Sequence, residues 1–334
     1  MQNLYKLILV IFIIFVFTFS SGQSFYYAGI MGDGLAIQMK LTLDGQKVSG
    51  HYYYDQVGIP LRLEGKLEED NRIRLEEYAE DINSSQLTGT FNGSLSSSMT
   101  EFGDTFTGEW VNNYGNLFSF SLKKIAEYVD FDLTQNRIET SSRYPYFIAP
   151  HTSTLNNLLQ DDFIQRQTDF LHEGQEVLKA NELYNSWTLD STTQISYYSD
   201  DLISLTDSSY LYTGGAHGYV VLDSYNFALN DMDIRILELR DMFTARADFM
   251  SLLNPFLIDR LGQQEAQWII DGSISSFSEG ELQIFTISPQ GLTFHFEQYS
   301  VGPYVQGIFE VVVPYDVLAS IIDESSPLLK FVGN

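Results

Sequence analysis

The feature that most constrains the fold is the regular alternation of apolar and polar residues between positions 25 and 123. The segment Ala36–Leu43 alternates throughout and is followed by Asp44-Gly45, a typical hairpin signal. A period of two residues places the apolar side chains of a strand on one face. About eight such strands, joined by consecutive short turns, predict an up-and-down β-barrel or a strongly curved antiparallel meander. We expect side chains, rather than a ligand, to fill a barrel of this size.

A short motif recurs in this barrel-like part: a hydroxyl residue, a glycine, any residue and then an aromatic residue. The three copies are Ser49-Gly50-His51-Tyr52, Thr88-Gly89-Thr90-Phe91 and Thr107-Gly108-Glu109-Trp110. Glycine inside a strand marks a bulge or a sharp bend, and a nearby aromatic ring can cover the space it leaves.

The second part of the chain mixes strands with two helical segments. Leucine and phenylalanine residues at spacings of three and four predict a helix over Ser153–Leu183, with a break near Gly174. A second helical segment is expected over 243–270, with a break at Pro255. Helices interspersed among antiparallel strands predict an α+β domain, with the helices packed on an antiparallel sheet.

The predicted organisation is therefore mainly β followed by α+β. We assign residues 23–124 to the antiparallel barrel-like domain and residues 125–334 to the α+β domain, with a short junction near Lys123-Lys124.

The first 22 residues have the pattern of a secretory signal peptide. A short polar start with one lysine is followed by Leu7–Phe19, which is apolar except at Thr18, and then by Ser20-Ser21-Gly22. We expect cleavage after Gly22 and export to the periplasm or the extracellular face of a bacterial envelope. A retained membrane anchor is the alternative, although a spanning helix needs about 20 apolar residues. The chain has no cysteine, so an apolar core must stabilise it without disulfides.

Charge limits the classes of partner. With 44 acidic against 18 basic residues, the formal net charge is −26. Nucleic-acid binding requires basic patches that neutralise phosphates, so we exclude it. A strongly acidic protein instead attracts cationic partners over long range. The alternative is that the acidity only aids solubility.

The run Tyr212-Thr213-Gly214-Gly215-Ala216-His217-Gly218 lies between two strand-like segments and is the strongest candidate for a site. Its glycines can adopt positive φ angles, so a tight connection can bring a tyrosine, a threonine and a histidine together. Exposed tyrosines are favoured at recognition surfaces. The ligand-binding residues that we predict are Tyr212, Thr213, Gly214, Gly215, His217, Tyr299 and Tyr304.

Catalytic signatures are weak by comparison. His217 could act as an acid or base, or it could only cap the turn. His172-Glu173 lacks the second histidine of a zinc-protease helix, and no Gly-x-Ser-x-Gly elbow or cysteine nucleophile is present. We therefore predict no catalytic residue, no metal and no cofactor.

Four blocks in the second part of the chain carry a family resemblance. They are Tyr212–His217, Leu237–Phe243, Ile287–Phe296, and a last block made of Tyr299, Pro303-Tyr304, Gly307 and Val311–Tyr315. On these blocks, residues from about 125 onward resemble the extracellular C-terminal domain of RsiV-type anti-sigma factors. They also resemble the related non-catalytic domain found beside polysaccharide deacetylases. The N-terminal part looks like small β-barrel modules of envelope proteins.

The resemblance implies a non-enzymatic envelope module that binds lysozyme outside the cell. Only six residues precede the apolar stretch, so we expect no cytoplasmic sigma-binding segment. The predicted function is binding of lysozyme, of another cationic protein or of a cell-wall glycan. The alternative is a peptidoglycan-modifying or hydrolytic envelope enzyme centred on His217.

Overall fold

The computed structural model describes residues 22–81, 84–96, 104–149, 152–180, 186–230 and 233–332. The expected signal peptide lies outside the described residues, apart from Gly22. Among the helices of the described ranges, none is both long and apolar enough to cross a membrane.

Eight antiparallel strands form the N-terminal barrel. They are β1 (Gln23–Met31), β2 (Leu35–Asp44), β3 (Lys47–Tyr54), β4 (Leu61–Leu67), β5 (Arg72–Asp81), β6 (Ser84–Leu95), β7 (Thr105–Asn112) and β8 (Leu117–Gln135). Each strand pairs with the next, and β1 also pairs with β8, which closes the barrel. The predicted up-and-down barrel is therefore confirmed, including the two-residue turn that follows Asp44.

Large side chains fill the barrel. Tyr27, Tyr52, Phe91 and Phe106 are fully buried inside it. Their rings meet edge to face, as between Tyr52 and Phe91, whose ring centroids lie 5.1 Å apart. The interior is a packed core, as expected for eight strands.

Strand β8 belongs to two sheets. Its first part completes the barrel, and Ala126–Gln135 pairs with β9 (Ile138–Phe147). Lys123 and Lys124 are paired with β1 and lie inside this continuous strand, so no separate linker segment is present there. The division into domains at 124/125 stays a prediction, and the pairing with β9 begins at Ala126. An alternating strand with charged residues on one face resembles a polar linker in sequence.

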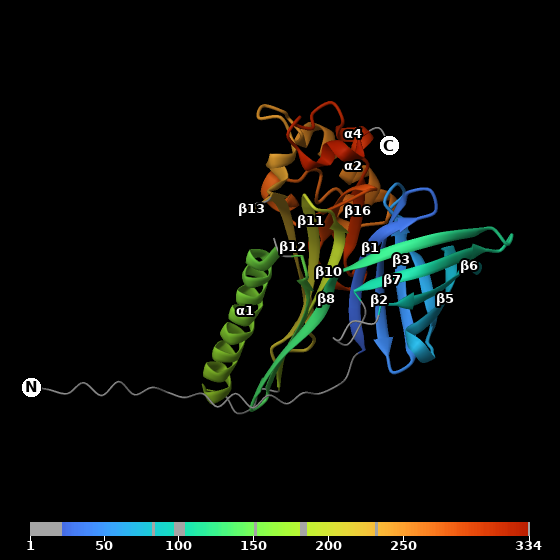
Figure 1. Ribbon diagram of the computed structural model, residues 1–334. Coiled ribbons are helices and arrows are strands. Elements are labelled where there is room, and N and C mark those ends of the chain that lie inside the picture. Colours follow the sequence, from blue (N-terminus) through green and yellow to red (C-terminus); the bar gives the residue numbers. More distant parts are fainter. Residues whose placement is uncertain are drawn as a thin grey trace, which may run out of the picture.

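The second sheet continues from β9 through β10 (Trp187–Tyr198), β11 (Leu202–Tyr212), β12 (Tyr219–Asn230) and β13 (Asp233–Ile236). All pairs in it are antiparallel except β9 and β10, which are parallel and are connected by helix α1 (Ser153–Ala180). In Figure 1, α1 lies on one side of this sheet, the barrel lies on the other, and the C-terminal elements lie above.

Helix α1 is not broken at Gly174, contrary to the prediction. A Cβ atom at this position would lie 2.8 Å from Ile138 Cδ1 and 3.0 Å from Trp187 Cε3. The glycine therefore allows close packing of the helix on the sheet rather than ending it. The predicted residues 181–183 of this helix lie outside the described part of the chain.

The C-terminal elements form a smaller layer. Its strands and helices are α2 (Met250–Gln263), α3 (Gln267–Ile270), β14 (Phe285–Ser288), β15 (Gly291–Phe296), β16 (Phe309–Val313) and α4 (Tyr315–Leu318). A short 3-10 helix, η1 (Glu69–Asn71), lies in the barrel. The described part of the C-terminal layer contains four more: η3 (Leu239–Met242), η4 (Glu279–Leu282), η5 (Tyr304–Gln306) and η6 (Pro327–Phe331).

Helix α2 runs through Pro255, where a break was expected. Leu253, Leu257 and Leu261 of this helix are fully buried. Burial of that apolar face outweighs the one backbone hydrogen bond that proline removes.

A buried amide joins the barrel to the second sheet. Gln38 Nε2 donates to the Tyr198 carbonyl at 3.0 Å, and the Tyr198 amide donates to Gln38 Oε1 at 3.1 Å. The Tyr26 hydroxyl also donates to Gln38 Oε1 at 2.8 Å. Because Gln38 is only 2 % exposed, these bonds are shielded from water and fix the two layers against each other.

Candidate ligand-binding face

Three of the predicted site residues come together in an aromatic cluster. His217, in the β11–β12 connection, packs against Tyr304 with ring centroids 4.2 Å apart and the planes tilted by 35°. The Tyr299 ring also packs against Tyr304, with a centroid distance of 5.7 Å. The Tyr304 hydroxyl donates to the Gly218 carbonyl at 2.9 Å, which ties the two loops together.

The remaining predicted residues form the loop beside this cluster. The Tyr212 hydroxyl folds back and donates to the Gly215 carbonyl at 3.1 Å. Gly214 has a φ of 83°, a conformation that glycine adopts without strain. Thr213 is half-buried in the same loop. That these residues bind a ligand stays a prediction.

Tyr299 is held in an unusual conformation. Its φ of 67° is rare for an aromatic residue, and its side chain is 53 % exposed. The two preceding residues are anchored to β12: the Leu222 amide donates to Glu297 Oε1, and the Val220 amide donates to Gln298 Oε1. Such strain persists only where the surroundings enforce it, and it is common at functional sites.

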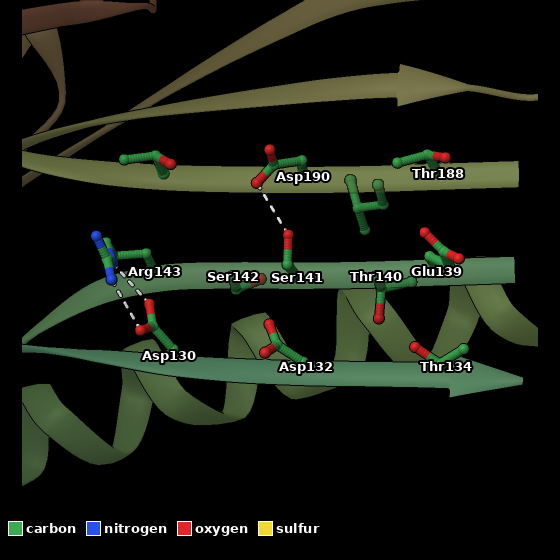
Figure 2. A pocket seen from close by; sticks show the side chains of 12 residues that line it. Asp130, Asp132, Thr134, Glu139, Thr140, Ser141, Ser142, Arg143, Thr188 and Asp190 are labelled. Carbon is green, nitrogen blue, oxygen red and sulfur yellow. Dashed lines mark hydrogen bonds and ion pairs between the residues drawn. The ribbon is translucent and has the colours of Figure 1, made fainter. Parts of the chain in front are cut away.

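A groove lies beside this cluster on the second sheet. Its cavity volume is about 540 Å³, and its floor is formed by β8, β9 and β10. Figure 2 shows polar side chains standing in rows across these strands, with a helix behind them. In the central row, Asp132 is paired with Ser141, and Ser141 with Asp190.

The groove is acidic. Its carboxylates are those of Asp130, Asp132, Glu139 and Asp190, against the single guanidinium of Arg143, which gives a formal charge of −3 (four negative, one positive). Arg143 Nε and Nη2 bind the two oxygens of Asp130 at 2.6 and 2.8 Å. The charge of Arg143 also acts on Asp132 and Asp190, so three of the four carboxylates share one guanidinium and the groove keeps its excess of negative charge.

The groove also perturbs one of these acids. Partial burial, followed by the negative charges of Asp130 and Asp190, raises the pKa of Asp132 above its usual value. The Ser141 hydroxyl donates to Asp190 Oδ1 at 2.9 Å and so holds this neighbouring carboxylate in place. A perturbed acid in a concave, polar site is typical of a functional surface.

The groove and the aromatic cluster share one face of the sheet. Asp190 is paired with Tyr210 of β11, which therefore continues the central row. The Tyr210 ring lies against Gly218, where a Cβ atom would approach its hydroxyl to 2.4 Å. Gly218 is also the residue whose carbonyl binds Tyr304, so one continuous surface leads from the carboxylates to the tyrosines.

Helix α1 covers the opposite face. Arg166 of α1 donates to Asp207 Oδ2 at 2.9 Å, and Asp207 alternates with Ser208 and Tyr210 along β11. The helix thus does not cover the groove, which lies on the side of the sheet that faces the barrel.

Sequence reasoning missed the groove. Its residues on β8 occupy every second position, as in Asp130, Asp132 and Thr134, whereas β9 contributes the continuous run 139–143. That alternation is visible in the sequence, but it does not reveal which strands are neighbours. The parallel pairing of β9 with β10 requires the α1 crossover and cannot be read from local spacing.

His217 is exposed and lies against its own turn and Tyr304. Its Nδ1 lies 2.9 Å from the Gly218 carbonyl, and its ring is exposed on the side away from Tyr304. Within the described ranges, no group of three or more histidine, aspartate or glutamate side chains is arranged to hold a metal ion.

Two family models match this part of the chain. Residues 133–220 match the model described as Deacetylase PdaC. Residues 240–316 match the model described as a protein of unknown function, DUF3298. The first range contains Tyr212–His217 and most of the groove, and the second contains Tyr299 and Tyr304. The resemblance to the domain found beside polysaccharide deacetylases is thereby confirmed, whereas the likeness to RsiV stays a prediction.

Solved structures include two similar chains. A DUF3298 family protein from Pseudomonas aeruginosa PAO1 is 17 % identical, with a TM-score of 0.45, and the match covers 60 % of this chain and 93 % of that one. A member of the DUF3298 family from Bacteroides fragilis NCTC 9343 is 18 % identical, with a TM-score of 0.38 and coverage of 61 % and 95 %. No curated protein sequence matches this chain.

Proposed function

We propose that this protein is an exported, non-enzymatic module of the cell envelope that binds a cationic protein, such as lysozyme, on the groove face. The observation that carries the proposal is the uncompensated acidic groove that continues into exposed tyrosines. The resemblance to RsiV-type domains and the predicted signal peptide support the extracellular setting.

The physical basis is charge complementarity with an aromatic anchor. Asp132, Glu139 and Asp190 offer carboxylates to lysine or arginine side chains of a partner. Tyr210 and Tyr299 are 42 % and 53 % exposed, and tyrosine supplies contact area together with a polar tip. The net charge of −26 adds long-range attraction that speeds the encounter.

A cell-wall glycan is the second candidate, and the hydroxyl groups of the groove favour it. Thr134, Ser141, Thr188 and Thr192 lie among the carboxylates. Sugar hydroxyls can bond to both kinds of group, and Tyr210 offers a ring at the end of the row. Glycan binding would depend little on salt, because a neutral sugar carries no charge.

The decisive experiment is a pull-down of the purified protein with lysozyme and with peptidoglycan fragments, at low and at physiological salt. We expect capture of lysozyme that weakens as salt rises. The double variant Asp132→Asn/Asp190→Asn should weaken it further, whereas Glu69→Gln/Asp70→Asn, which neutralises two exposed acids on the barrel, should have little effect.

The other outcomes separate the alternatives. Salt-insensitive capture of glycan that the groove variant abolishes would favour the glycan. Muropeptides whose mass has changed, with the change lost in His217→Ala, would make the protein an enzyme. Capture of neither partner would contradict the proposed function.

A further inference from the structure

The two ends of the barrel differ in character. The β1–β2, β3–β4, β5–β6 and β7–β8 connections lie at the same end, because consecutive strands alternate in direction. Every exposed large apolar side chain of the described barrel residues lies at this end, among them Ile30, Leu35, Val57, Ile59, Tyr114 and Leu117. The opposite end carries exposed charged residues such as Lys47, Glu69 and Asp70. We call the first the apolar end.

A buried carboxylate lies inside the barrel near this end. Glu77 of β5 is only 2 % exposed. It accepts hydrogen bonds from the Tyr52 hydroxyl at 2.6 Å, the Trp110 indole at 2.6 Å and the Thr88 hydroxyl at 2.5 Å. Tyr52 pairs with Leu61 at the start of β4, which places the cluster next to the β3–β4 connection.

The three donors come from the three copies of the repeated motif. Tyr52 is the aromatic residue of the first copy, Thr88 the hydroxyl residue of the second, and Trp110 the aromatic residue of the third. Phe91, the aromatic residue of the second copy, packs between them, with ring centroids 5.1 Å from Tyr52 and 6.4 Å from Trp110. The three copies of the motif therefore surround one carboxylate, that of Glu77.

Glu77 has neutral donors but no cation. Among the described residues its side-chain partners are Tyr52, Thr88 and Trp110. Burial, followed by the Glu77 carboxylate, raises the pKa of Tyr52 far above its usual value, so this phenol keeps its proton and remains a hydrogen-bond donor. An ionised group in an apolar core is costly unless a cation accompanies it, and the aromatic faces around it also attract cations.

Trp110 separates this acid from solvent. Its side chain is half-buried, and its indole lies over Gly89, where a Cβ atom would approach Nε1 to 2.5 Å. Only glycine leaves room for the indole in this position. On its outer side the indole contacts Phe118, which is 38 % exposed at the apolar end. Trp110 therefore lies between Glu77, to which it donates, and Phe118 at the apolar end.

We propose that the apolar end of the barrel binds small hydrophobic organic cations, with the ammonium group paired to Glu77 and the apolar body in the space that the half-buried Trp110 side chain leaves when it turns outward. Trp110 acts as the cover of this site. On binding, the indole gives up its hydrogen bond to Glu77, and the ligand ammonium replaces that donor. The site is separate from the groove, so its test does not depend on the groove's partner.

The test is calorimetric titration of the purified protein with 2-phenylethylammonium and with 2-phenylethanol, which has nearly the same shape but no charge. We expect the ammonium to bind at least about tenfold more tightly than the alcohol. Glu77→Gln should remove that preference. Glu76→Gln, on the outward face of the same strand, is the matched control and should keep it.

Trp110→Phe provides an independent test, because it keeps the carboxylate and removes the hydrogen-bonded cover. It should bind the ammonium more tightly than the natural protein does. Equal binding of ammonium and alcohol by the natural protein would overturn the proposal, and this comparison holds even where Glu77→Gln fails to fold. Ammonium binding that survives unchanged in a folded Glu77→Gln protein would overturn it as well.

Discussion

Replacing Arg166 with methionine should destabilise the protein strongly, because it leaves a buried acid without its cation. Asp207 is fully buried in β11, and Arg166 Nη1 of helix α1 lies 2.9 Å from its carboxylate. Methionine retains most of the aliphatic packing but removes the charge. The change therefore tests the ion pair that fastens α1 behind the groove.

The size of the effect follows from burial. Removing one partner of a buried ion pair costs about 3–5 kcal/mol. Asp207 keeps hydroxyl donors from Thr193 at 2.8 Å and from Ser209 at 3.0 Å, and Arg166 itself is 28 % exposed. We therefore expect the lower end of the range, about 3 kcal/mol in the free energy of unfolding.

Urea unfolding at pH 7, followed by far-UV circular dichroism, measures this loss. The matched control is Lys179→Met on the same helix, whose partner Glu176 is 63 % exposed; it should leave the urea midpoint almost unchanged, because water screens an exposed ion pair. Adding Asp207→Asn to Arg166→Met should recover part of the stability, since an amide needs no counter-charge. A loss for Arg166→Met no larger than that of the control would refute the reasoning.

Three further predictions concern the site and the pH dependence. Gly218→Ala should displace the Tyr210 ring and weaken lysozyme capture while leaving the urea midpoint almost unchanged; a normal capture yield would contradict the continuous surface. Burial, followed by the charge of Arg143, lowers the pKa of Lys40 to about 8 in the folded protein. Above that pH, the Lys40 amine is mostly neutral in the folded protein but still protonated in the unfolded chain. Stability should thus rise by the order of 1 kcal/mol between about pH 8 and pH 9.5, and Lys40→Met should flatten that part of the unfolding profile. The hydrogen bond from His295 lowers the pKa of Glu310, so its stabilisation is present above about pH 4.5 and is lost as pH falls through the lowered value. Glu310→Gln should make acid unfolding, followed by circular dichroism, less steep below pH 4.5.

The sequence predicts the barrel well because each of its signals is local. Alternation over Ala36–Leu43 and the turn after Asp44 each specify one hairpin, and eight consecutive hairpins leave closure as the simplest arrangement. The predicted aromatic cluster is also brought together in part. The four-block resemblance placed His217 and Tyr304 in one family pattern, and their rings pack against each other.

The parts that could not be predicted depend on contacts between distant segments. Gln38 looks like an ordinary outward residue of β2 until β10 lies against it. Glu77 follows another glutamate and resembles part of a solvated acidic pair, yet three motif copies in other strands enclose it. Asp132 and Asp190 become neighbours only through the parallel pairing of β9 with β10. Local pattern cannot supply register between such strands.

Because β8 is shared by both sheets, it also restricts which insertions and deletions the protein can tolerate. In the second half of β8, Asp130 and Asp132 face the groove, whereas Phe131 packs toward α1. Deleting one residue after Glu127, the last residue of β8 that pairs with β1, would keep the barrel side chains in place and reverse every later residue of the strand. Two carboxylates would then point beneath the helix, and a phenylalanine would enter the groove. Length changes in β8 should therefore be tolerated only in steps of two residues.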